Sequence, residues 1–171
     1  MKTMTILSLM AMAVLLGCDK DDDDDNNVTG VDREFTMRAA MGNYAEIDAG
    51  KTAAAKAIDA GIREFGQMMV TDHGNAGSEL KSIAGRLGLY APDSLDAEHV
   101  ALKNQLSTLT GREFDSVYIH AQVKDHQKTI ALFEQESDNG NNDELVAFAN
   151  KTLPHLRHHL HKADSLANNY E

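Results

Sequence analysis

Four side chains that can bind a metal ion stand where the surrounding pattern calls for apolar residues. They are Glu46, His73, His126 and His159. Around each of them, apolar residues recur every three or four positions, which is the spacing of one face of an α-helix. Burying a Glu or a His without a partner costs several kcal/mol. These side chains are therefore exposed at a seam, hydrogen-bonded to one another, or coordinating a ligand.

Three imidazoles and one carboxylate suit Zn, Cu, Fe or Ni better than Ca or Mg. We therefore take these residues as a candidate site for a transition metal. The alternative is a Glu/His polar cluster that only fixes how the helices pack. His155, His158 and His161 crowd the same two turns as His159 and are interpreted as a solvated face.

No catalytic residue is assigned. The sequence shows no Ser-His-Asp or Cys-His nucleophile arrangement and no nucleotide-binding loop. These are the patterns that nucleophilic catalysis and phosphate binding require. The sequence therefore favours a binding module over an enzyme.

His126 lies in the stretch whose helical pattern is strongest. Thr110 followed by Glu113 matches a capping box, so a helix is predicted to start there and to end near Glu136. A polar turn is predicted over 137–142. The apolar stripe of this helix, with His126 at its centre, is Ile119, Val123, His126, Ile130 and Phe133.

The same reasoning predicts three further long helices and one short one. Asn141 with Glu144 is predicted to cap the last of them. Small residues dominate the stripe of the first helix, so a neighbouring helix can approach it closely. Gly66, inside the second helix, disfavours that helix by about 1 kcal/mol relative to Ala. The predicted ranges are about 32–57, 59–89, 95–109 for the short helix, and 143–167.

Short connections between these helices make neighbouring helices antiparallel, which predicts an all-α, four-helix bundle. The helix over 95–109 would be an extra short helix in the crossover before the third long helix. Counting residues from each turn, at about 1.5 Å per residue, places the four polar side chains at comparable depths. We therefore expect Glu46, His73, His126 and His159 to converge.

The N-terminus has the features of a lipoprotein signal peptide over residues 1–17. Lys2 precedes an apolar run of about twelve residues, too short for a bilayer core that needs about 20. The sequence Leu-Leu-Gly-Cys ending at Cys18 resembles the lipobox of bacterial lipoproteins, in which the cysteine is lipidated. Cys18 is the only cysteine of the chain. The alternative is an ordinary signal peptide with an incidental cysteine.

Residues 18–30 are predicted to be an acidic tether ahead of the folded part, 31–171. Residues 19–25 comprise six Asp and one Lys, a local charge of −5. Such a segment cannot form a core. It is a spacer, or an export signal of the acid-rich type found in surface lipoproteins, or, through Asp19, an inner-membrane retention signal. The expected location is the cell envelope, anchored to the outer membrane on its periplasmic or surface face.

The net charge of −11 argues against nucleic acid as a partner, because little would neutralise the phosphates. The expected partner is the membrane, through the lipid anchor. The sequence predicts no particular protein partner.

From about 32 to 167 the chain resembles a bacterial family of secreted and lipoprotein domains catalogued as domain of unknown function 4142. The resemblance implies a ferritin-like four-helix fold and no particular activity. Di-iron bundles use Glu-x-x-His on two helices, and this sequence contains no Glu-x-x-His. The segments that carry the resemblance are REFTMRAAMGNYAEIDAGKTAAAKA, FGQMMVTDHGNAGSELKSIA, LDAEH, GREFDSVYIHAQVKDHQKTIALFE and LPHLRHHL.

The sequence thus predicts a lipid-anchored bundle of the cell envelope that binds or senses a transition metal or small ligand through its Glu/His cluster. The alternative is a non-catalytic structural or interaction lipoprotein in which the cluster only fixes packing. A ferritin-related oxidoreductase is the third and weakest hypothesis.

Overall fold

The structure is a computed structural model that describes residues 27–170. The predicted signal peptide, Cys18 and the acidic tether up to residue 26 lie outside these residues. The described part is helical and contains no β-strand, which confirms the all-α prediction. Its helices are α1 (Gly30–Lys56), α2 (Ala60–Leu87), α3 (Ala97–Thr108), α4 (Gly111–Asn139), α5 (Asp143–Ala167) and the short 3₁₀ helix η1 (Asn168–Tyr170).

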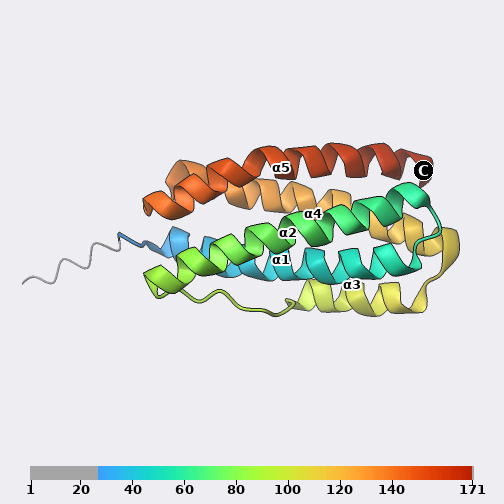
Figure 1. The fold of residues 1–171 in the computed structure, drawn as a ribbon, viewed down its shortest axis with the longest axis horizontal. Helices are drawn as coiled ribbons and strands as arrows, with labels where there is room; N and C mark the ends of the chain where they lie inside the picture. The colour runs from blue at the N-terminus through green and yellow to red at the C-terminus, as the bar shows by residue number, and fades with distance from the viewer. Residues whose placement is uncertain (1–26, 171) are drawn as a thin grey trace, which may run out of the picture.

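The long helices form an elongated bundle made of two helical hairpins (Figure 1). α1 packs along α2, and α4 packs along α5. The hairpins meet where α1 contacts α4 and where α2 contacts α5. α3 lies on the outside of the bundle, in the crossover that carries the chain from α2 to α4. The bundle and the extra short helix before the third long helix are therefore as predicted.

Apolar side chains fill the interior in two clusters. One contains Phe35, Phe133 and Phe148. The other contains Phe65 and Phe114 and lies farther along the same helices. Each long helix contributes to both clusters because its apolar stripe runs its whole length. Between the clusters, the stripes pass through the four polar residues that the sequence singled out.

α1 and α2 approach each other closely at two glycines. A Cβ atom on Gly66 would lie 2.7 Å from the carbonyl oxygen of Gly50, and a Cβ on Gly50 would lie 2.7 Å from that of Gly66. No other residue type fits this contact without a shift of the backbone. The close approach that the small residues of α1 predict is thus present. Gly66 is unfavourable for helix α2 alone, but its lack of a side chain allows α1 to pack against it.

Two predicted features of α4 are wrong in detail. The helix continues to Asn139, one turn beyond Glu136, and the N–H of Gly140 donates to the carbonyl of Glu136 at 2.8 Å. The polar turn is correspondingly shorter. At the other end, Thr110 is the N-cap residue, but its side chain makes no capping hydrogen bond. The next residue, Gly111, has a left-handed backbone with φ 61°, which is not the geometry of a capping box.

The cap of α5 also differs from the prediction by one residue. Asn142, not Asn141, is the N-cap, and its side-chain oxygen accepts from the N–H groups of Glu144 and Leu145 at 3.1 and 3.2 Å. Both asparagines also donate their backbone N–H groups to Asp32 on α1, at 3.0 and 2.9 Å. A contact from another helix therefore holds the turn from which α5 begins.

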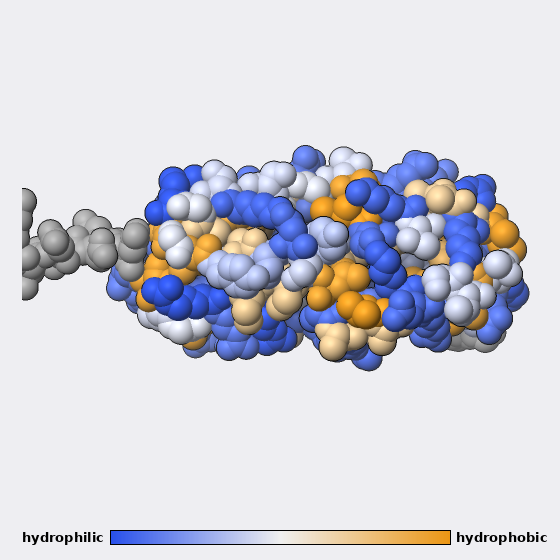
Figure 2. All heavy atoms as spheres, turned by 90° about the horizontal axis from the view of Figure 1, so that it is seen from below, coloured by the Kyte–Doolittle hydropathy of each residue, from blue (hydrophilic) through white to orange (hydrophobic). Residues whose placement is uncertain are grey.

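On the face that carries α3, hydrophilic side chains surround separate hydrophobic patches (Figure 2). The large apolar side chains that are exposed in the described residues are Met37, Tyr44, Ile58, Tyr90 and Val100. Among residues 27–170, none of the helices combines the length and the apolar character needed to span a bilayer.

Candidate metal centre

The structure brings three of the four predicted site residues together in the middle of the bundle. His73 of α2, His126 of α4 and His159 of α5 are 4, 1 and 2% exposed. Each offers a potential ligand atom, and these three atoms all lie within 4.8 Å of one another. The ring centroids are 5.6, 5.4 and 5.4 Å apart, so the imidazoles form a nearly regular triangle. This is the only group of potential metal ligands found in the described part of the chain.

Each imidazole uses one ring nitrogen to hold its orientation. His73 Nδ1 lies 2.9 Å from the side-chain oxygen of Asn43 on α1. His126 Nδ1 lies 2.9 Å from the backbone carbonyl oxygen of Gln122, one turn earlier in α4. Both of these partners are acceptors, so each bonded nitrogen carries the proton and donates.

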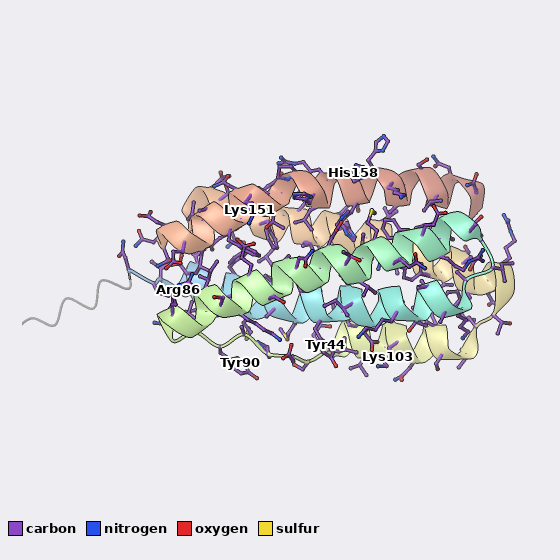
Figure 3. The ribbon with its side chains drawn as sticks, viewed as in Figure 1. Tyr44, Arg86, Tyr90, Lys103, Lys151 and His158 are labelled. Carbon is purple, nitrogen blue, oxygen red and sulfur yellow. The ribbon has the colours of Figure 1, made fainter. Side chains whose placement is uncertain are left out.

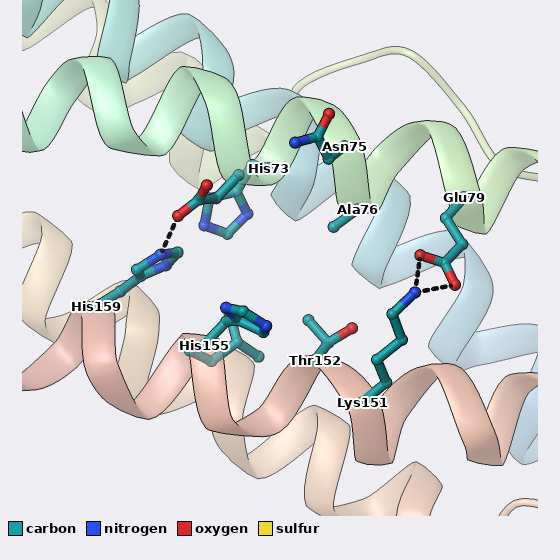
Figure 4. A pocket seen from close by; sticks show the side chains of 10 residues that line it. His73, Asn75, Ala76, Glu79, Lys151, Thr152, His155 and His159 are labelled. Carbon is teal, nitrogen blue, oxygen red and sulfur yellow. Dashed lines mark hydrogen bonds and ion pairs between the residues drawn. The ribbon is translucent and has the colours of Figure 1, made fainter.

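His159 follows the same rule with a different nitrogen. Its Nε2 donates to Asp72 Oδ2 at 2.9 Å, and this bond links α5 to α2 (Figure 4). Asp72 stands next to His73 in the sequence, yet it orients the histidine of another helix. The second nitrogen of a neutral imidazole carries a lone pair, so the three outward hydrogen bonds fix three lone pairs.

The nitrogens that carry these lone pairs are His73 Nε2, His126 Nε2 and His159 Nδ1. All three are buried and have no hydrogen-bond partner. An unsatisfied buried polar group costs about 1–3 kcal/mol. Three such atoms in one small volume are unusual in a folded protein, and they carry the pattern of metal ligands with hydrogen-bonded outer partners.

Burial keeps these imidazoles neutral, which is the form that binds a metal. It lowers the pKa of His73 well below the usual value, an effect to which the neighbouring His126 and His159 add. Burial also lowers the pKa of His126 and brings that of His159 to about 4. Near neutral pH no proton needs to leave the three histidines before an ion can bind.

The spacing of the ligand atoms is slightly wide for a bound ion. A tetrahedral Zn²⁺ with Zn–N bonds of about 2.0–2.1 Å holds its nitrogens about 3.3 Å apart. Starting from separations of up to 4.8 Å, each nitrogen has to move inward by less than about 1 Å. Small rotations of the rings supply a movement of that size.

Glu46, the fourth predicted residue, is buried in the same layer but is not in this group of ligand atoms. Its Oε1 approaches His126 Nδ1 at 3.7 Å, which is the nitrogen already bonded to the carbonyl of Gln122. Burial, with a smaller effect from Asp125, raises the pKa of Glu46 to about 8. The carboxyl group of Glu46 is therefore mostly protonated at neutral pH. It lies next to His126 Nδ1 and not next to the imidazole nitrogens that have no hydrogen-bond partner.

A cavity of about 250 Å³ lies between α2 and α5 and reaches the cluster. Figure 4 shows His73 and His159 at one end of this space, with Ala76 and Thr152 farther along it. At the far end the ammonium of Lys151 bonds both carboxylate oxygens of Glu79 at 2.8 Å. The cavity connects the histidines with solvent.

The remaining histidines of α5 are on its surface, in agreement with the interpretation of the sequence. His155, His158 and His161 are exposed. His158 points away from the bundle in Figure 3. His155 lines the cavity, one turn from His159, without belonging to the buried group.

Three residues that orient the imidazoles were not identified from the sequence. The role of Gln122 is carried by its backbone carbonyl, so its side chain gave no signal. Asp72 and Asn43 act across helices, on His159 and His73. Asn43 precedes Glu46 by three positions, which puts it on the same helical face, and that spacing was the only available indication.

The comparisons concern family and fold. The chain matches the family described as "Domain of unknown function (DUF4142)" over residues 19–166. Its fold is similar to that of a DUF305 fragment from Deinococcus radiodurans, whose crystal structure superposes with a TM-score of 0.73 at 14% sequence identity. The superposition covers 83% of this chain and 98% of the other. No curated protein matches the chain.

Proposed function

We propose a function from the site itself, because the chain belongs to the DUF4142 family, whose description names no activity. The proposed function is binding of one transition metal ion by His73, His126 and His159. The observation that carries it is a group of three buried imidazoles whose ligand atoms lie within 4.8 Å of one another. Each ring is held by an outward hydrogen bond and keeps one nitrogen without a partner. Imidazole ligands suit Zn, Cu, Fe and Ni. Glu46 acts in this proposal as a buried carboxyl behind His126.

We also infer that the bundle is of the ferritin-like type. The inference is supported by two antiparallel hairpins joined by one long crossover, which carries α3. Ferritin-like proteins commonly place metals among the side chains of facing helices. Here the donors are histidines without a Glu-x-x-His motif, so the proposed centre holds a single ion rather than a di-iron pair.

The proposed setting is the outer membrane, with the bundle carried by a lipid on Cys18. The lipobox-like sequence that ends at Cys18 and the acidic segment after it support this setting. Replacing Cys18 with Ala should move the protein from the membrane fraction to the soluble fraction. Unchanged fractionation of that variant would argue against a lipid anchor.

The metal proposal is tested by thermal unfolding of metal-free protein without a His-tag. Zn²⁺ or Cu²⁺ should raise the melting temperature at pH 7.5, because a ligand that binds only the folded state stabilises it. The gain is about 2.7 kcal/mol at a hundredfold excess over the dissociation constant. His126→Ala should abolish the increase. Circular dichroism of this variant establishes that it is folded.

The matched control is the surface cluster of α5. A variant with His155, His158 and His161 all replaced by Ala should keep most of the increase. The opposite result, with His126→Ala responding and the triple variant not, would place the metal on the surface. If neither metal shifts the wild-type protein, the histidines only fix packing, and the structural alternative is correct.

A further inference from the structure

The histidine cluster is open on one side, and that side faces the cavity between α2 and α5. His73 and His159 line the cavity, whereas His126 and Glu46 do not. An ion held by the three imidazoles therefore has His126 behind it and the cavity in front. Three protein ligands with a fourth position left open is the pattern of sites that accept an external ligand.

The charge of such a centre favours an anion at the open position. Three neutral imidazoles leave the full charge of a divalent ion uncompensated in the interior, where electrostatic interactions are strong. Of the nearby carboxyl groups, Asp72 lines the cavity but is hydrogen-bonded to His159 Nε2, and Glu46 lies outside the cavity, 3.7 Å from His126 Nδ1. Neither is among the three clustered ligand atoms.

The cavity has room for a ligand of a few atoms. A volume of about 250 Å³ holds several molecules of water, each of which occupies about 30 Å³ in the liquid. Half-buried Ala76 and Thr152 form part of its walls, and Leu156 lies between Thr152 and His159. The Thr152 hydroxyl donates to the Phe148 carbonyl at 2.8 Å, so it offers lone pairs to what enters.

We propose that the metal centre binds a small exogenous anion, which enters through the α2–α5 cavity and occupies the fourth coordination position. The ligand class is a monovalent anion of a few atoms, such as hydroxide, azide or formate. This inference rests on the proposed metal site and adds to it an accessible, exchangeable position. The ion would then be a reactive or sensing centre and not a closed structural one.

The experiment is an azide titration of the Co²⁺-loaded protein, followed by visible absorption. Co²⁺ suits nitrogen ligands, and its absorption bands change when a ligand in its coordination shell changes. Azide should alter the Co²⁺ spectrum and saturate. Ala76→Leu, which fills the cavity beside His73, should weaken azide binding by about tenfold or more without changing the affinity for Co²⁺.

The matched control is Thr129→Leu. Thr129 is also half-buried, but it lines a separate cavity on the α1–α4 side, together with Glu46. This variant should bind azide as the wild type does. Equal weakening in both variants would overturn the proposed route. A Co²⁺ spectrum that forms normally and does not respond to azide would overturn the open position while leaving metal binding intact. Absence of a Co²⁺ spectrum would refute metal binding and this inference with it.

Discussion

The two nitrogens of each buried histidine have different surroundings, and this difference gives the site its chemistry. The outer nitrogens donate to Asn43, the Gln122 carbonyl and Asp72, while the inner nitrogens have no partner. An imidazole that donates one fixed hydrogen bond cannot easily change its tautomer or flip its ring. The three lone pairs are therefore oriented before an ion arrives, which is how outer hydrogen bonds support metal ligands in general.

Another buried carboxyl group, that of Glu136 in α4, shows how burial without a hydrogen-bond partner raises the pKa of an acid. Glu136 is 0% exposed, and neither of its carboxyl oxygens has a hydrogen-bond partner. Burial, together with the neighbouring Asp32, raises its pKa from 4.5 to about 8. Because the folded pKa is above the unfolded one, the contribution of Glu136 to stability is full below pH 4.5. It is lost as the pH rises through 8.

Replacing Glu136 with Gln removes this titration. We expect the variant and the wild type to have similar free energies of unfolding near pH 4.5. At pH 8 the variant should be the more stable, by up to about 4 kcal/mol. Urea unfolding at the two pH values measures the difference. The control, Glu134→Gln, changes an exposed ion pair with Arg157 and should alter stability by under about 1 kcal/mol at both. Parallel pH profiles for the two variants would contradict a buried, protonated Glu136.

At this scale the sequence identified the metal-competent residues but not their partners. Periodicity placed His73, His126 and His159 on inward stripes, because a stripe depends only on residues of the same helix. The link from Asp72 to His159 spans 87 positions and depends on the rotation of two helices. The position of Glu46 beside His126 Nδ1 also depends on how α1 and α4 are rotated about their axes. Counting residues along each helix gives the depth of a side chain in the bundle but not this rotation.

At the scale of helices, the α1–α2 contact shows how packing outweighs intrinsic propensity. A glycine inside a helix is less favourable than alanine by about 1 kcal/mol. Glycine at position 66 lowers the intrinsic stability of α2 but allows α1 to approach closely. A Cβ atom there would lie 2.7 Å from the carbonyl oxygen of Gly50. Gly85, also in α2, is exposed, and a Cβ added to it would have no neighbouring atom within 4 Å.

These two glycines give a matched pair of substitutions with opposite expected signs. Gly66→Ala should destabilise the protein by about 1–3 kcal/mol, because a packed backbone must shift. Gly85→Ala should stabilise it by up to about 1 kcal/mol through helix propensity alone. Chemical unfolding of both variants measures the effects. Stabilisation by Gly66→Ala would mean that the helices do not approach as closely as the structure has them.

The sequence predicted which segments are helical and which side of each helix is buried. It predicted the first and last residues of the helices less accurately. The residues of α2 that recur every three or four positions are buried, as periodicity predicts, except for the half-buried Ala76. They are Ile62, Phe65, Met69, His73, Ala76, Leu80, Ile83 and Leu87. Asn141 and Asn142, in contrast, are equally good caps for α5 on local grounds. Asp32 accepts the backbone N–H of both, at 3.0 and 2.9 Å. That contact between α1 and the α4–α5 turn holds the two residues in place, and no local sequence pattern contains it.

Across the whole molecule, each hairpin turn is held by an aspartate of the other hairpin. Asp32 of α1 accepts from the turn between α4 and α5. Asp115 of α4 accepts from Ile58 and Asp59, in the turn between α1 and α2, at 3.2 and 2.9 Å. Both aspartates are 0% exposed. Each hairpin thus contributes one aspartate that binds the turn of the other, with one such contact at each end of the bundle. The three histidines lie between these two contacts.

Charged hydrogen bonds of this kind contribute about 1.5–3 kcal/mol, and this sets the expected cost of removing either charge. Asp32→Asn and Asp115→Asn should each lower the free energy of unfolding by about 2–3 kcal/mol. The control, Asp138→Asn, affects an exposed side chain near the end of α4 and should change it by under about 0.5 kcal/mol. Urea unfolding at pH 7 measures all three.

The pH dependence and the double variant test whether the two contacts act independently. Burial alone would raise the pKa of Asp32, but hydrogen bonds from Thr29, Asn142 and Asn141 lower it from 3.8 to about 2. Its contribution is therefore present above pH 3.8 and lost as the pH falls through 2, and Asp32→Asn should flatten that loss. Because the two sites lie at opposite ends, their costs should add to within about 0.5 kcal/mol. A double variant that costs no more than one single variant would show instead that the hairpins separate as one unit once either end is released.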